Sequence, residues 1–396
     1  MSWPQVYVRN GDRDVIGELS DWRELKLVQS RNDVGRWELH TRSAETAALL
    51  SPVTDKNGAI VEARGVIIRR DGKTLASGWC DGSPNAKSDG RVVEWSFAGW
   101  DDTVLLSDAL AWPNPSAPIE NQGRKEDVRT GPASNRIRDY FLQNVQQRQG
   151  IPGARGGNYL NLGPNRKSRA RFRGLLELSQ AIAKRDLNFA IRQRDSDKSL
   201  FLFQWLPVDK RDRVHFTPDL GHVHGWSHTI TPASATHVVI GAGGEEENRA
   251  FREYRGHVSE GELGGVRKIE RFKDMSGLDP SESGWEDEAL DAAREFLDES
   301  TSRASFSIEL SPGPDLRYGI HYEVGDLVLA YIGQDENSQP VGLIEDLIEE
   351  AEITWNEEGE RAAVNIGAPD TETTNRRLER WIRLLQRQLH YQGTYK

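Results

Sequence analysis

Short segments of alternating polar and apolar residues, separated by tight-turn residues, run through most of this chain. QVYVRN (5–10) is one such segment, and residues 59–82 contain two more around Asp71-Gly72. Because side chains of a strand point alternately to its two faces, this pattern predicts half-buried β-strands, and Asp-Gly between such flanks predicts a hairpin. Strands this short and evenly spaced favour a barrel or sandwich over residues 1–112.

Helical patterns interrupt the strands. The sequence predicts a short helix over Ala44–Leu50, capped by Ser43. Residues 113–206 combine two amphipathic helices with the strands LNFAIRQ and SLFLFQW, which is the pattern of an α/β unit. Another helix is expected at 285–300, and strand patterns return on either side of it, over residues 207–242 and 303–366.

The C-terminal segment predicts one more helix, over residues 372–391. Its apolar residues recur at spacings of three and four, which predicts an apolar stripe that packs on a neighbour in the same chain or in another. The residues of this expected assembly stripe are Leu378, Trp381, Ile382, Leu385 and Leu389.

Gly325-Asp326 interrupts the strand-like run YEVGDLVLAYIGQDE (322–336). A glycine inside a strand pattern predicts a bulge or tight bend, and an aspartate there can bond nearby backbone N–H groups. We therefore expect Gly325 and Asp326 to form a structural bend that directs one strand into the next sheet, and we favour this role for Asp326 over a catalytic one.

Composition limits the classes of function. The formal net charge is −11 over 396 residues, which argues against duplex nucleic acid as a main partner because phosphate binding needs a basic face. Cys80 is the single cysteine, so an internal disulfide and a Cys-rich metal site are excluded. No stretch approaches the roughly 18 apolar residues of a membrane span, so we expect no stable membrane insertion.

The patterns that could carry chemistry are weak. VVIGAGGEEENR (238–249) lacks the third glycine of a dinucleotide fingerprint, and its acids would repel a pyrophosphate. His222, His224 and His228 could bind zinc, but only Asp219 offers a partner nearby. Among 62 acidic residues, paired carboxylates are expected by chance and do not indicate a glycosidase. The sequence therefore predicts no enzyme activity, no cofactor and no metal.

The order of four stretches resembles a known family. They are GELSDWRELKLVQSRNDVGRWELH, the run SGW…VVEWSFAGWDDTVLL, FTPDLGHVHGWSHTITPASATHVVIGAGGEEENR and LRYGIHYEVGDLVLAYIG. In this order they resemble the tail-hub (tail-tip, minor tail) proteins of siphophages that infect actinobacteria. These are similar to the N-terminal hub part of tail-associated lysins and to the baseplate hub of contractile tails. The resemblance extends to about residue 367 and does not cover the terminal helix.

The resemblance implies a β-rich α+β fold: two tail-tube-like β-barrels, an outer α/β part and a C-terminal amphipathic helix. We map the first barrel to residues 1–112 and the second barrel to residues 207–243 with 303–367. The outer part maps to residues 113–206 with 244–302, and the helix to residues 368–396.

The resemblance also implies a function. Three copies would form a pseudo-sixfold ring, a homotrimer that joins the hexameric tail tube to the threefold tip and lines the DNA exit channel. Its partners would be a distal tail protein or tail-tube ring above and a tip, fibre or plug protein below. The protein would be made in the host bacterial cytoplasm and reside at the tail tip of the virion, and DNA would pass without sequence-specific binding.

Acidic residues lining the lumen would repel phosphate, and we expect Glu345, Glu349 and Glu352 to face it. The alternatives are a glycan-binding or cell-wall-degrading tip protein and the hub of a contractile injection device. Residues 368–396 are too few for the appended domain that many lysins carry, which disfavours the degrading enzyme.

Overall fold

The computed structural model describes residues 3–81, 84–88, 92–217, 223–244, 249–256, 268–281, 284–300, 303–310, 316–334 and 340–367. The chain forms one unit from Met1–Ser227 and Phe306–Gly367 and a second unit that includes His228–Ser305. The expected terminal helix, with Leu378, Trp381, Ile382, Leu385 and Leu389, lies outside the described residues.

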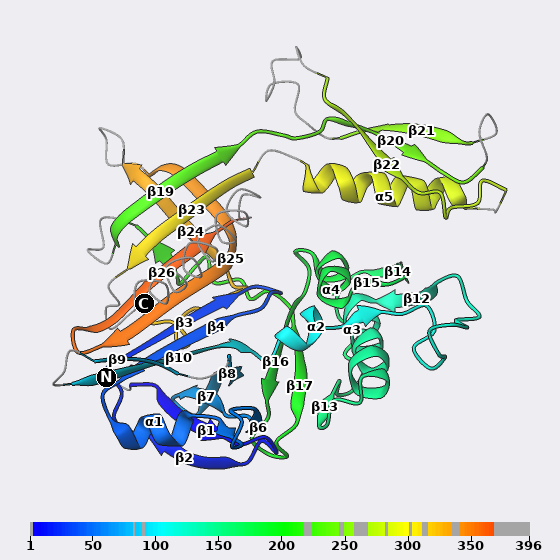
Figure 1. Cartoon of the computed structure of the whole chain (residues 1–396). Coiled ribbons are helices and arrows are strands. Elements are labelled where there is room, and N and C mark those ends of the chain that lie inside the picture. The colour runs from blue at the N-terminus through cyan, green and yellow to red at the C-terminus, as the bar shows by residue number, and fades with distance from the viewer. Residues whose placement is uncertain are drawn as a thin grey trace, which may run out of the picture. The chain divides into compact units, whose positions relative to one another are not determined.

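A 14-stranded sheet dominates the chain (Figure 1). Its main path runs, in spatial order, through β19 (Val223–Thr231), β23 (Arg303–Leu310), β26 (Gly359–Ile366), β25 (Pro340–Asn356), β3 (Glu24–Ser30), β4 (Arg36–Thr41), β10 (Val93–Asp101), β8 (Lys73–Cys80), β7 (Gly65–Arg70), β1 (Gln5–Arg9) and β2 (Val15–Leu19). Off this path, β24 (Leu327–Gln334) pairs with β25, β18 (His215–Phe216) with β24, and β9 (Asn85–Ser88) with β10.

The N-terminal and C-terminal β stretches meet where β25 pairs antiparallel with β3, from Glu350↔Ser30 to Asn356↔Glu24. Both strands alternate, so every second side chain enters one shared hydrophobic core. Trp37 and Trp355, one from each stretch, are almost fully buried in this core. The two stretches are therefore continuous in both sheet and core.

Two local predictions are confirmed. Asp71 and Gly72 both have positive φ and connect β7 to β8, as a tight hairpin turn requires. Helix α1 (Ala44–Leu50) begins after Ser43, whose side chain accepts a hydrogen bond from the backbone N–H of Thr46. A small hairpin of β5 (Val53–Thr54) and β6 (Ile60–Glu62) follows α1.

A second hydrophobic core lies within residues 105–202. Helix α3 (Ala133–Phe141), its π-helical continuation Leu142–Arg148 and α4 (Leu175–Ala183) bury the apolar positions that the helical spacing predicts. The other elements are α2 (Val104–Ser107), β11 (Leu110–Ala111), β12 (Asp127–Pro132), β13 (Ala154–Arg155), β14 (Asn165–Ala170), β15 (Arg173–Gly174), β16 (Asn188–Gln193) and β17 (Leu200–Trp205).

The second unit has its own small core. β20 (His237–Gly241) is the central strand, antiparallel to β21 (Phe251–Arg255) and parallel to β22 (Glu270–Asp274). Helix α5 (Trp285–Glu299) contributes Ala289, Ala293 and Leu297 to the cluster that Val238 and Ile240 of β20 complete.

The β-rich α+β class expected from the sequence is confirmed. The division into two barrels and an outer part stays a prediction. We note that β20, which the expected second barrel of 207–243 includes, pairs with β21 and β22 and not with the 14-stranded sheet.

Candidate functional site

Gly325 forms a tight junction between two parts of the first unit. Its φ is +90°, and a Cβ at this position would lie 2.3 Å from Nδ2 of Asn188. The Asn188 amide donates to the Gly325 carbonyl (3.1 Å), and the Gly325 N–H donates to the carbonyl of Ile348 (2.8 Å). β24 begins only at Leu327, so this pair precedes the strand and does not interrupt it. Only glycine fits this position.

Asp326 is buried beside that junction. Its carboxylate accepts a hydrogen bond from the Glu323 N–H (2.7 Å) and forms an ion pair with Lys210 (2.7 Å). Burial raises the pKa of Asp326, and Lys210 opposes this shift. The Lys210 N–H also donates to the carbonyl of Leu327 (2.8 Å). Asp326 thus helps to hold the chain around Lys210 against the start of β24.

The three acids expected to face a lumen occupy different environments on β25. Glu345 is partly exposed and pairs with Arg211 (2.7 Å), and Glu352 pairs with Lys26 of β3 (2.6 Å). Glu349 lies at the bulge between Ile348 and Glu350. Whether these acids face a lumen depends on an assembly and stays a prediction.

Glu349 is the most buried of these acids. It pairs with Arg31 (3.1 Å), which also donates two hydrogen bonds to the carbonyl of Lys184 just after α4 (2.7 and 2.8 Å). Burial raises the pKa of Glu349, and the Arg31 guanidinium opposes the shift. This pair joins the 14-stranded sheet to the neighbouring α/β part.

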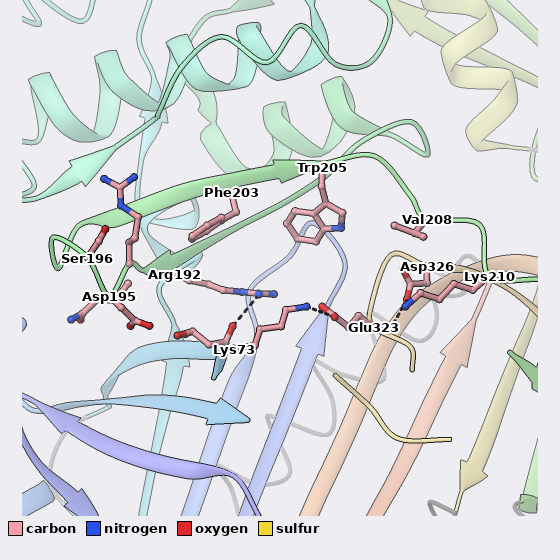
Figure 2. Close-up of a pocket in the computed structure, with 13 residues that line it drawn as sticks. Lys73, Arg192, Asp195, Ser196, Phe203, Trp205, Val208, Lys210, Glu323 and Asp326 are labelled. Carbon is pink, nitrogen blue, oxygen red and sulfur yellow. Dashed lines mark hydrogen bonds and ion pairs between the residues drawn. The ribbon is translucent and has the colours of Figure 1, made fainter. Parts of the chain in front are cut away.

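Beside Asp326 lies a cleft of about 590 Å³ (Figure 2). One wall is the outer face of β17, where Phe203 and Trp205 point into the cleft. The opposite side carries the ion pairs Lys73–Glu323 and Lys210–Asp326. The cleft therefore combines aromatic surface with hydrogen-bonding groups, the usual composition of a ligand pocket.

Sequence reasoning missed this cleft. SLFLFQW was predicted to form a strand, but no environment was assigned to the second face of that strand. In the structure Leu200, Leu202 and Gln204 are buried, so Phe203 and Trp205 fall on the other face. The alternation itself was the available signal, because large apolar side chains occupy both faces of this strand and only one face packs into the core beneath it.

A buried polar cluster also went unpredicted. Arg9 donates to Asp102 and Gln193 (both 2.9 Å), Ser77 donates to Asp102, and the Arg9 guanidinium lies 4.1 Å from the Trp79 ring centre. The cluster ties β1 and β8 to β16. No sequence signal could have found it, since Arg9 and Gln193 lie 184 residues apart in the chain.

The side chains of the three histidines considered as zinc ligands are not described in the structure. His222 is not among the described residues, and the side chains of His224 and His228 are not described. In the ranges that are described, no group of three or more His, Cys, Asp or Glu side chains is placed to hold a metal. Within the same ranges, every helix is too short or too polar to cross a membrane.

Comparisons with known proteins identify the fold. It resembles the 43 kDa tail protein of prophage MuSo2 from Shewanella oneidensis, with a TM-score of 0.55 and 14% identity over 91% of this chain and 98% of that chain. It also resembles the tail protein from Neisseria meningitidis MC58, with a TM-score of 0.53 and 13% identity over 92% of this chain and 96% of that one.

A third similar structure is prophage tail protein gp18 from Listeria monocytogenes EGD-e, with a TM-score of 0.53 and 9% identity over 96% of this chain and 99% of that chain. Comparison with curated proteins gives no match.

The sequence profile of the family described as Siphovirus ReqiPepy6 Gp37-like protein matches residues 5–368. This range includes all four stretches that carry the resemblance and most of the chain, and the similarity to siphophage tail proteins is thereby confirmed. The chain belongs to the Siphovirus ReqiPepy6 Gp37-like family of phage tail proteins.

Proposed function

We propose that three copies of this chain form a ring at the tail tip, with pseudo-sixfold symmetry in the sheet around the DNA channel. The observation that carries this proposal is the pairing of β25 with β3, which places two β-rich stretches of one chain edge to edge. If each chain supplies two such β-rich stretches, a trimer contains six of them. That number matches a hexameric tail tube above and a threefold tip below.

The ends of the sheet path support ring closure. Among the described strands, β2 ends the path on one side and β19 on the other. Such ends carry backbone N–H and C=O groups that another strand can pair with. Val15 and Ile16 of β2 are exposed, which favours burial of this strand in an assembly. Pairing between neighbouring copies would satisfy both edges.

The channel would be lined by the sheet face that points away from the shared core. Glu352 lies on this face of β25 and pairs with Lys26, and Glu38 forms a hydrogen bond with His40 on β4. Paired charges of both signs leave little cationic surface for DNA phosphates, so DNA would pass without adhering. Glu345 would extend this lining further along β25, and Glu349 would support the wall through Arg31.

The role in the virion would be structural and without catalysis. One side of the ring would contact the tail tube or a distal tail protein. The other would contact a tip, fibre or plug protein. The protein would be synthesised in the host cytoplasm before assembly.

Electron microscopy of the purified protein at high concentration, alone and mixed with its tail-tube protein, tests the ring. We expect threefold particles with a central hole as wide as a DNA duplex. Val15→Glu should abolish them because it places a charge on the β2 edge. Val53→Glu is the matched control, since Val53 is similarly exposed but lies outside the main sheet. Monomers under both conditions, or rings unaffected by Val15→Glu, would contradict the model of edge closure.

A further inference from the structure

Among the described residues, the cleft beside Asp326 has one cation without an ion-pair partner. Four charges of its lining form two ion pairs, Lys73–Glu323 and Lys210–Asp326. Two more lining charges pair with groups outside it, Asp195 with Arg69 and Arg194 with Asp197. Arg192 remains, and no carboxylate among the described residues forms an ion pair with it.

The Arg192 guanidinium is nevertheless held in place. Its Nη1 donates to the carbonyl of Thr74 (3.2 Å), and its Cζ lies 5.9 Å from the centre of the Trp205 ring. Figure 2 shows its side chain extending across the cleft below Trp205. A guanidinium oriented in this way keeps donors available for a planar carboxylate.

We propose that this cleft binds an oligosaccharide that contains a carboxylate-bearing sugar residue. The carboxylate would accept hydrogen bonds from Arg192. A sugar ring would lie with its C–H face against Trp205 or Phe203, since the electron-rich face of an aromatic ring attracts such polarised hydrogens. The Lys73–Glu323 and Lys210–Asp326 pairs supply both donors and acceptors for the hydroxyl groups.

Other ligand classes fit the cleft less well. A phosphate monoester carries nearly two negative charges, which is more than the one cation without an ion-pair partner balances. A peptide that adds a strand needs a sheet edge, whereas the cleft wall is the face of β17, from which Phe203 and Trp205 project. A volume of about 590 Å³ lies within the usual range for small-ligand pockets.

Isothermal titration of the full chain with a hyaluronan tetrasaccharide, which alternates glucuronate and N-acetylglucosamine, tests this inference. The comparison ligand is the same tetrasaccharide with its carboxyl groups reduced to alcohols. We expect the acidic form to bind at least about tenfold more tightly. This comparison uses the unaltered protein and does not depend on any variant folding.

Variants locate the binding. Arg192→Gln should remove the preference for the acidic form, and Trp205→Ala should weaken the binding of both forms by about tenfold or more. Arg211→Gln and Trp3→Ala are matched controls, because they remove an arginine and a tryptophan outside the cleft lining, and they should change nothing.

Several results would overturn the proposal. These are equal affinity for both tetrasaccharides, no heat of binding up to about 10 mM ligand, or full binding in Arg192→Gln and Trp205→Ala. A glutamate-rich peptide that binds with the same dependence on Arg192, while the sugar does not, would show a protein ligand instead. Ring formation is measured separately, so either proposal can fail without the other.

Discussion

Two turns of this protein use the same two residue types in opposite order and for different purposes. Asp71-Gly72 closes the hairpin between β7 and β8, and both residues are exposed. Gly325-Asp326 precedes β24, and both residues are buried. A Cβ on Gly72 would meet nothing within 4 Å, whereas a Cβ on Gly325 would meet Asn188 at 2.3 Å. The first turn is therefore a local device, and the second depends on distant parts of the chain.

The glycines should give the largest contrast. Gly325→Ala should lower the free energy of unfolding by about 3 kcal/mol, because it combines positive-φ strain with displacement of the Asn188 amide. Gly72→Ala brings the strain alone and should cost about 1 kcal/mol. Urea unfolding of both variants measures the difference. Similar losses in the two variants would refute the distinction between the turns.

The lysine beside each turn should show a smaller contrast. Lys210→Met leaves Asp326 buried without its cation and should cost about 2 kcal/mol. Lys73→Met breaks the Lys73–Glu323 pair, whose lysine side chain is 48% exposed, and should cost less than about 0.5 kcal/mol. The same unfolding assay applies. A larger effect at Lys73 would show that its ion pair stabilises the cleft.

The two lysine variants should also differ in their response to pH. Burial raises the pKa of Asp326 in the folded state. Its contribution to stability is therefore complete below the ordinary aspartate pKa of about 3.9 and is lost as pH rises through the folded value. Removing Lys210 raises that pKa further, so the penalty of Lys210→Met should shrink as pH falls from neutral towards 4.

Unfolding midpoints measured between about pH 4 and 8 follow this change. Adding Asp326→Asn to Lys210→Met removes the titrating group and should make the penalty independent of pH. Lys73→Met provides the control. A constant penalty for Lys210→Met would mean that Asp326 does not titrate differently in the variant.

The smallest effect is expected at Asp71. Asn-Gly suits the same two-residue hairpin turn as Asp-Gly, and the Asp71 side chain is exposed, so Asp71→Asn should change the unfolding free energy by less than about 0.5 kcal/mol. Thermal unfolding is a sufficient measurement. A loss above about 1 kcal/mol would indicate a tertiary role for this turn as well.

These contrasts show how far the sequence predicts the site. Asp71-Gly72, the Ser43 cap and the helix over residues 285–300 were predicted because the relevant interactions lie within a few residues of one another. The cleft was not predicted, because its walls come from residues 73–74, 192–210 and 323–326. Their contact depends on packing between elements far apart in the chain.

The sequence by itself determined the strand pattern, the helices within the α/β part and the resemblance to siphophage tail proteins. Backbone propensity and periodicity act locally, and the order of motifs is carried by the residues themselves. Only the tertiary structure decided that β25 pairs with β3, that Asp326 is buried against Lys210, and that Arg192 remains without a carboxylate partner among the described residues. The pairing register of strands and the partners of ion pairs depend on which surfaces come into contact in the folded chain. Local sequence patterns do not specify these contacts.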